Sequence, residues 1–221
     1  VVMAVIISTG ESAHAHLYPA TTSAPEVPTA KLATAPAFEW SSSDATAIGT
    51  PYEAGVVVTY SLHTVTGRNA LTGAALWHYT RTDRNVCTAL QLQSRTLAIY
   101  ANGDNCDEVT ALYTATGKRS NERTLTDNGH PTYQTLSDTL LIVTRAAVHA
   151  VDPSSLIDRF DYLAPAGCTM LSAVGGSAGI LISQRCADGD HLVLRDRYAD
   201  DNSKTSIKWN LVTTAVPVSA D

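Results

Sequence analysis

Residues 69 to 77 read Asn-Ala-Leu-Thr-Gly-Ala-Ala-Leu-Trp, and this stretch decides the fold because its pattern recurs along the chain. Two short apolar runs, 56–60 and 64–65, precede it, so one unit reads as strand, strand, tight turn and strand. The pattern returns at 96–100, 108–113 and 115–118, again at 139–143, 147–151 and 152–160, and more loosely at 179–183, 191–195 and 208–209. A period of about forty residues predicts a repeat architecture.

The turns within these units predict antiparallel strands, because short alternating runs separated by Gly, Asn, Asp or Ser leave no room for a long helix. Gly73 and Gly117 supply the positive φ that a tight turn needs, and Asp152 occupies the turn of the third copy. Trp77 is expected to cover the seam between adjacent sheets, with Phe160 and Trp209 as its counterparts.

A four-stranded unit cannot bury both faces alone, whereas radial stacking of such units leaves only short edges. We therefore predict an all-β fold of β-propeller-type repeats over residues 41–221. About four four-stranded antiparallel blades are expected, forming an incomplete propeller truncated at its C-terminus. Residues 216–221 read as the opening of a further strand.

Four cysteines, Cys87, Cys106, Cys168 and Cys186, allow three pairings. The first two are 19 residues apart and the last two 18, and the pairs are offset by 81 and 80 residues, so one local pair occurs twice. We predict the disulfides Cys87–Cys106 and Cys168–Cys186, which imply an oxidising compartment. Four free buried thiols remain an alternative. A zinc site fits poorly because the chain has no Cys-x-x-Cys pair.

The N-terminal part predicts an anchor and a tether. Residues 1–7 form an uncharged apolar run too short to span a bilayer, which we interpret as the remnant of a signal or membrane anchor. A buried N-terminal strand is the alternative. Residues 8–40 are rich in Ala, Thr, Ser and Pro and predict an extended tether. The expected location is therefore extracytoplasmic and membrane-anchored, in the cell envelope.

The repeats resemble a known family. Asn-Ala-Leu-Thr-Gly-Ala-Ala-Leu-Trp (69 to 77) and Tyr-Thr-Ala-Thr-Gly-Lys (113 to 118) are similar to the Ala-x-Asp-x-x-Thr-Gly-x-x-x-Trp core of quinoprotein-type, or PQQ-like, β-propeller repeats. The resemblance covers roughly residues 55 to 215 and extends to uncharacterised actinobacterial membrane-anchored envelope propellers, BamB-like in style. Two features depart from the pattern: the turn Asp is replaced by Asn69 and Tyr113, and the second copy lacks the Trp. The family usually has six to eight blades.

Candidate sites are weak in this sequence, and we predict no catalytic residues, no metal and no cofactor. The clustered carboxylates do not follow the residue order of a calcium-binding loop, and we interpret them as solvent-exposed turns. His14 and His16 fall in the tether, and the other histidines are expected to be structural. The glycine-rich run 175–179 reads as a flexible loop rather than a nucleophile elbow. The carboxylate clusters are Asp104 with Asp107 and Glu108, Asp188 with Asp190, and Asp200 with Asp201; the structural histidines are His63, His78, His130, His149 and His191.

The net charge of -6, without a basic run, excludes nucleic acid as an expected partner. The leading hypothesis is a non-enzymatic, membrane-tethered binding or scaffold module that presents blade loops or sheet edges to other envelope proteins. The alternative is the ligand- or quinone-binding portion of a quinoprotein-type dehydrogenase or sensor. A secreted hydrolase has only isolated carboxylates, such as Asp104 and Asp190, in its favour.

Overall fold

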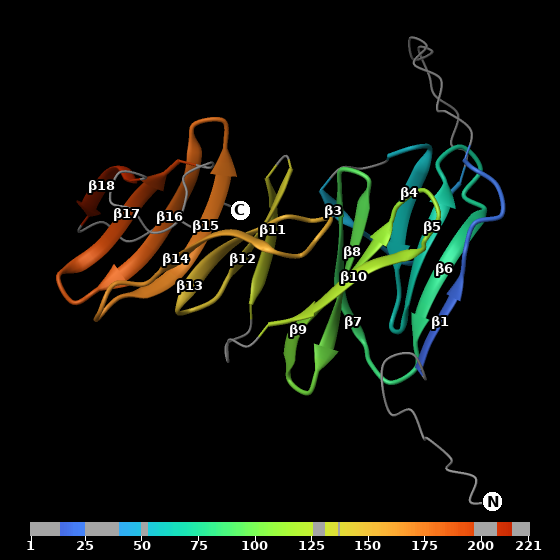
Figure 1. Ribbon diagram of the computed structural model, residues 1–221, viewed down its shortest axis with the longest axis horizontal. Helices are drawn as coiled ribbons and strands as arrows, with labels where there is room; N and C mark the ends of the chain where they lie inside the picture. Colours follow the sequence, from blue (N-terminus) through green and yellow to red (C-terminus); the bar gives the residue numbers. More distant parts are fainter. Residues whose placement is uncertain are drawn as a thin grey trace, which may run out of the picture. The chain divides into compact units, whose positions relative to one another are not determined.

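The computed structural model describes residues 14–24, 40–49, 53–125, 131–136, 138–196 and 207–213. Within these residues the named elements are all β-strands, arranged in four sheets (Figure 1). The chain divides into two compact units, residues 1–102 with 110–120 and residues 103–109 with 121–221. The all-β prediction with propeller-type sheets is therefore confirmed. Among the described residues no helix is long and apolar enough to cross a membrane.

Strand order is the same in outline in each sheet, because each repeat adds consecutive antiparallel strands. The first sheet runs β1 (Ala15–Tyr18), β6 (Ala75–Arg81), β5 (Thr64–Asn69), β4 (Val56–Tyr60), β2 (Ala45–Thr46). The second runs β10 (Arg119–Thr124), β9 (Asn105–Tyr113), β8 (Arg95–Asn102), β7 (Val86–Leu92), β3 (Ile48–Gly49). The third runs β11 (Thr132–Leu136), β12 (Thr139–Val143), β13 (Ala147–Val151), β14 (Asp158–Leu163), and the fourth runs β15 (Thr169–Gly176), β16 (Gly179–Cys186), β17 (Gly189–Arg195), β18 (Ile207–Thr213).

The first two sheets have five strands each, one more than the sequence predicts. In the first sheet the extra strand is β1, which pairs antiparallel with β6. Since β1 lies within the predicted tether, residues 15–18 are part of a sheet rather than a spacer, and His16 pairs with Thr80 in it. In the second sheet the extra strand is β3, which pairs parallel with β7. Residues 1–13 and 25–39, with most of the predicted anchor and tether, lie outside the described residues, as do 214–221.

The repeat turns have one shared geometry. Gly73 and Gly117 both have φ 71, and their amides donate to the carbonyls of Asn69 and Tyr113, at 2.8 and 2.7 Å. In the third repeat Leu156 takes the same place, with φ 58 and an amide hydrogen bond to Asp152 of 2.8 Å. A non-glycine residue pays a steric cost at such a φ. The third turn therefore keeps the backbone conformation without the glycine.

A side chain four positions after the turn reaches over the next turn. Trp77 Nε1 donates to the Thr114 carbonyl at 2.8 Å, and a Cβ on Gly117 would lie 2.6 Å from the Trp77 ring. In the second repeat Asn121 stands where the family pattern has Trp, and its Nδ2 donates to the Ser154 carbonyl at 2.7 Å. The first and second repeats thus each hydrogen-bond the turn of the repeat that follows.

Trp40 makes the same contact with the first repeat turn. Its Nε1 donates to the Ala70 carbonyl at 3.0 Å, and a Cβ on Gly73 would lie 2.6 Å from its ring. Residue 40 falls at the end of the predicted tether, but Trp40 is part of the repeat packing.

The third and fourth sheets share one apolar core. It joins side chains of β11–β14 to Met170, Ala173, Ile180, Ile182 and Val193 of the fourth sheet. Buried Arg195 closes this core, with its guanidinium 5.0 Å from the Phe160 ring centroid and 5.3 Å from that of Tyr162. Cation–π contacts of this kind let a buried cation pack against aromatic rings. The residues contributed by the third sheet are Leu136, Leu141, Val143, Val148, Ala150, Phe160 and Tyr162.

All four cysteines are disulfide-bonded. Cys168 is bonded to Cys186 across the β15–β16 hairpin, Cys87 and Cys106 are also disulfide-bonded, and no free cysteine is present among the described residues. The arrangement agrees with the pairing predicted from the cysteine spacing.

Candidate functional site

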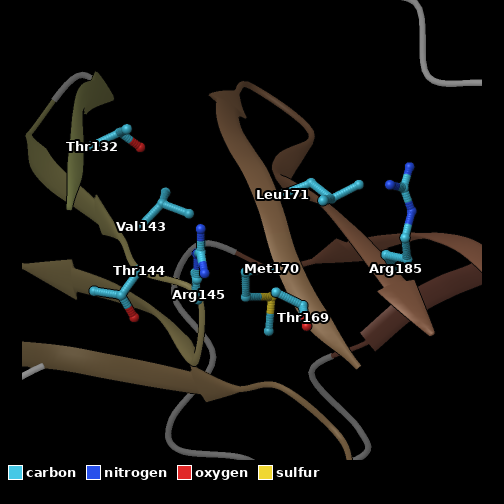
Figure 2. Close-up of a pocket in the computed structure, with 8 residues that line it drawn as sticks. All are labelled: Thr132, Val143, Thr144, Arg145, Thr169, Met170, Leu171 and Arg185. Carbon is cyan, nitrogen blue, oxygen red and sulfur yellow. The ribbon is translucent and has the colours of Figure 1, made fainter. Parts of the chain in front are cut away.

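A pocket of about 410 Å³ opens in the second unit, where the β12–β13 turn approaches β15. Figure 2 shows Arg145 on that turn, facing the start of β15, with Val143 and Met170 beside it. Its volume lies in the range of small-ligand sites. The pocket is lined by Thr132, Val143, Thr144, Arg145, Thr169, Met170, Leu171 and Arg185.

The turn that carries Arg145 is held on three sides. Thr144 Oγ1 accepts from the amides of Ala146 and Ala147 at 3.2 and 3.0 Å, which fixes the turn internally. The Arg145 carbonyl accepts from the Met170 amide at 3.0 Å, and the Ala146 carbonyl accepts from the Ala164 amide at 2.8 Å. Because the backbone of the turn is fixed, binding at Arg145 would order its side chain without also having to order the turn.

Arg145 is the basic group of the pocket that no acidic side chain neutralises among the described residues. Arg185, in contrast, makes two hydrogen bonds to Asp190, at 2.8 and 3.1 Å. That guanidinium lowers the pKa of the Asp190 carboxyl, and the carboxylate raises the pKa of Arg185. The free positive charge at the pocket is therefore that of Arg145, which favours a carboxylate or another anion.

The edge of the pocket is covalently fixed. Thr169 and Arg185 are register partners in β15 and β16, and each is adjacent in sequence to a cysteine of the Cys168–Cys186 disulfide. The buried side chains of Val143 and Met170 form an apolar part. Together these groups can bind an anion that carries an apolar portion, such as an acidic peptide segment.

Two clusters of His, Cys, Asp and Glu bring potential metal ligands together. The first holds His149, Asp158 and Asp161, but His149 Nδ1 lies 2.7 Å from Asp161 Oδ1, and Asp158 accepts from Arg123 at 2.6 and 2.8 Å. The second holds Cys186, Asp188 and His191. Cys186 has no thiolate to offer because it is in a disulfide. Both clusters are thus satisfied by protein partners.

The histidines predicted to be structural contact other protein groups wherever the structure describes them. His63 Nδ1 lies 2.9 Å from the Arg84 carbonyl, and His191 Nε2 lies 2.9 Å from Asp188 Oδ1. The His78 ring stacks on Tyr18 with centroids 4.3 Å apart. His130 and the carboxylates Asp200 and Asp201 lie outside the described residues.

Two carboxylates differ from the solvated-turn interpretation. Asp107 and Glu108 are buried in β9, whereas Asp104 is exposed in the β8–β9 turn. Burial, with a smaller contribution from the Asp107 charge, raises the pKa of Tyr133, whose hydroxyl donates to the Cys106 carbonyl. Residues 107–112 of β9 are buried without interruption, so burial in the sheet overrides the polar character of this stretch.

The predicted repeat-turn residues divide into two groups. Gly73, Trp77, Gly117 and Asp152 take part in the turn packing, and the Asp152 carboxylate accepts from the amides of Ser154 and Ser155 at 2.9 Å. Trp209 lies in β18 and is exposed, so it covers no described turn. The run 175–179, predicted as a flexible loop, is the β15–β16 hairpin, with Gly175 and Gly176 inside β15.

No family model and no curated protein matches this chain. Among solved structures it is similar to BamB from Moraxella catarrhalis, with a TM-score of 0.51 and 16% identity over 75% of this chain and 47% of that one. It is also similar to the quinohemoprotein alcohol dehydrogenase ADHIIG from Pseudomonas putida HK5, with a TM-score of 0.51 and 12% identity over 72% of this chain and 33% of that one. At this identity the likeness shows a shared propeller-type fold. The chain spans less than half the length of either protein.

Proposed function

We propose that this protein is a non-enzymatic binding module of the cell envelope that uses the Arg145 pocket to bind an acidic segment of a partner protein. The observation that carries the proposal is the unneutralised Arg145, on a turn whose backbone is fixed, beside the buried side chains of Val143 and Met170. A preformed site needs little reorganisation to bind a carboxylate.

The disulfides and the fold support the location and the role. Two disulfides persist in an oxidising compartment and are rare in the cytosol. The likeness to BamB supports a scaffold role, and the apolar run at residues 1–7 supports a membrane tether like that of actinobacterial envelope propellers. The clusters of titratable side chains described above are closed by their own ion pairs, which favours binding over catalysis.

Site-specific photocrosslinking in cells that make the protein tests the proposal. A benzoylphenylalanine at Thr132, on the pocket rim, should give a discrete crosslinked protein, and Arg145→Glu should remove it. Arg95→Glu makes the same charge change in the first unit and serves as the matched control, with the crosslink expected to persist. A Thr132 crosslink that is absent, or that survives Arg145→Glu, contradicts the proposal.

Titration of the purified protein with pyrroloquinoline quinone separates this proposal from the quinoprotein alternative. We expect no saturable change in the quinone absorbance. Stoichiometric binding that Arg145→Glu abolishes would contradict the proposal and would identify the pocket as a quinone-binding site.

A further inference from the structure

One of the two clusters described above, Cys186 with Asp188 and His191, combines the residue types that bind zinc. One ligand atom from each side chain, a sulfur, a carboxylate oxygen and a ring nitrogen, lies within 4.8 Å of the other two. Zinc sites in proteins are built from these same three kinds of ligand, in tetrahedral sets of four. The cluster therefore holds three of the four ligands, although the sulfur cannot bind a metal while it is in the disulfide.

The disulfide itself supplies the fourth group. Cys168 is the bonding partner of Cys186, and the adjacent residues Thr169 and Arg185 are register partners in β15 and β16. Because this pairing holds the two strand ends together, we expect the cysteines to stay side by side when the bond between them is broken. Two cysteines, one histidine and one aspartate then lie together. The sequence conceals this set, because the two cysteines are 18 residues apart.

The β16–β17 hairpin brings its three ligands to one place. Cys186 pairs with Gly189 and Gln184 pairs with His191, so Cys186 and His191 lie on the same face of adjacent strands, two positions apart. Gly189, directly opposite Cys186, contributes no side chain to that face. Asp188 lies in the two-residue turn that joins the strands. The hairpin thus presents the three side chains around one end of the sheet.

In the disulfide-bonded state Asp188 and His191 contact each other. His191 Nε2 lies 2.9 Å from Asp188 Oδ1, and the Asp188 side chain is 68% exposed. An ion pair this exposed contributes little to stability, so a metal ion displaces it at small cost. Ligand atoms of a tetrahedral zinc site lie about 3.3 to 3.8 Å apart, which small rotations of the carboxylate and of the two freed sulfurs would reach.

We propose that reduction of the Cys168–Cys186 disulfide converts this end of the fourth sheet into a zinc site, with Asp188 and His191 as the other ligands. A dithiol reductant gives two electrons to the disulfide, whose sulfurs take up two protons, and the reductant itself becomes a disulfide. Zn²⁺ then displaces both thiol protons to solvent, and no further electron moves. The metal ion joins the same strand ends that the disulfide joined.

The other disulfide of the chain provides a matched comparison. Cys87 and Cys106 have almost the same separation in the sequence, and both are disulfide-bonded. Among the described residues, however, no cluster of potential metal ligands includes either of them. The proposal therefore assigns a zinc site to only one of two similarly spaced disulfides, which a test can distinguish.

Cobalt titration of the full chain tests the proposal, because Co²⁺ held by thiolates in a tetrahedral site absorbs visible light and is displaced by Zn²⁺. The chain is reduced with dithiothreitol, freed of the reductant under nitrogen and titrated with Co²⁺. We expect one Co²⁺ per chain in the reduced wild type and in Cys87→Ser/Cys106→Ser. We expect none in Cys168→Ser/Cys186→Ser or in the disulfide-bonded chain.

Two single variants test the remaining ligands. His191→Ala and Asp188→Asn should each weaken Co²⁺ binding at least about tenfold. His16→Ala is the matched control, because His16 is an exposed histidine of the first sheet, and it should leave the binding unchanged. Far-UV circular dichroism of each reduced variant shows that its strands are retained.

The outcomes separate this inference from the proposed function. A reduced wild-type chain that gives no visible cobalt band overturns the zinc site, including the case in which reduction unfolds the chain. A band that survives both His191→Ala and Asp188→Asn, or that persists in Cys168→Ser/Cys186→Ser, also overturns it, because other groups then bind the metal. Arg145 is not among the ligands, so the Thr132 crosslink and the zinc site can each fail alone.

Discussion

The third and fourth sheets are built from the same repeat and differ in how many of their faces are buried. In the third sheet Leu140 and Val151 on one face and Leu141 and Phe160 on the other are all buried. In the fourth sheet only the face toward the third sheet is buried. The difference shows that one strand pattern serves a sheet covered on both sides and a sheet covered on one. Packing, rather than strand propensity, therefore decides the stability of each.

The largest expected effect contrasts Phe160 with Trp209. Phe160→Ala should lower the free energy of unfolding by about 4 kcal/mol, because it opens a cavity in the shared core. Trp209→Ala should cost less than about 1 kcal/mol, since its ring is already half in water. Urea denaturation at the lowest workable protein concentration measures both changes. Equal losses would mean that the two positions are packed alike.

Two glycines of the β15–β16 hairpin, Gly179 and Gly176, are expected to differ in how much an alanine substitution destabilises the fourth sheet. Gly179 has φ 140, and a Cβ there would lie 2.0 Å from the Arg195 carbonyl oxygen, so Gly179→Ala should cost about 3 kcal/mol. Gly176→Ala, where a Cβ would meet open space, should change stability by less than about 0.5 kcal/mol. Thermal unfolding of the pair measures the difference. A tolerant Gly179 would indicate that the hairpin has another backbone geometry.

A disulfide joins the two ends of the β15–β16 hairpin in the fourth sheet, whereas the third sheet contains no cysteine. Replacing Cys168 and Cys186 together by serine should lower stability by about 3 kcal/mol in the chain-entropy model. The loss should appear mainly in hydrogen exchange of β15–β18 amides, with β12 and β13 less affected. Uniform loss of protection in both sheets would show that they unfold as one unit.

The smallest expected effect concerns acid sensitivity. Burial disfavours the ionised Asp152, but hydrogen bonds from Ser154 and Arg159 outweigh burial and hold its pKa well below its usual range. Because the folded pKa is the lower one, Asp152 stabilises the protein above about pH 4, and this stabilisation is lost as the pH falls further.

Asp152→Asn should cost about 1 kcal/mol at neutral pH, since solvent screens the pair, and should flatten the decline of stability below pH 4. Asp190→Asn in the fourth sheet is the comparison, because the Arg185 guanidinium that pairs with Asp190 is 59% exposed and the pair should contribute less to that decline. Equilibrium unfolding followed from pH 7 to pH 2 measures both variants. Parallel curves for wild type and Asp152→Asn would contradict the assigned hydrogen bonds.

Sequence reasoning recovers the repeat because its turn is local. The positive φ at Gly73 and Gly117 follows from three or four neighbouring residues, and the spacing alone placed Leu156 at the equivalent position despite its side chain. The repeat pattern did not identify β7, β11 and β15. These strands contain polar residues that interrupt the apolar alternation, and they are recognised as strands only by their pairing with neighbouring strands. Trp40 could have been found, since it precedes Trp77 by 37 residues, close to the repeat period.

The pocket could not have been predicted from the sequence. Arg145 is one of many arginines, and it stands out because no acidic side chain pairs with it among the described residues, whereas several others pair with a carboxylate far along the chain. Arg123 pairs with Asp158, for example, and Arg159 bridges Asp138 and Asp152. The absence of such a partner is a tertiary property that no local pattern carries.

The contacts of Trp40, Trp77 and Asn121 with the following turn have a consequence for biosynthesis. Each hydrogen bond joins a side chain to a turn that is translated after it. A segment emerging from the ribosome therefore lacks this hydrogen bond until the next turn has formed. We therefore expect folding to advance along the chain in the direction of translation, one repeat after another. A pause after the first or the second repeat would leave Trp77 or Asn121 without its hydrogen-bond partner.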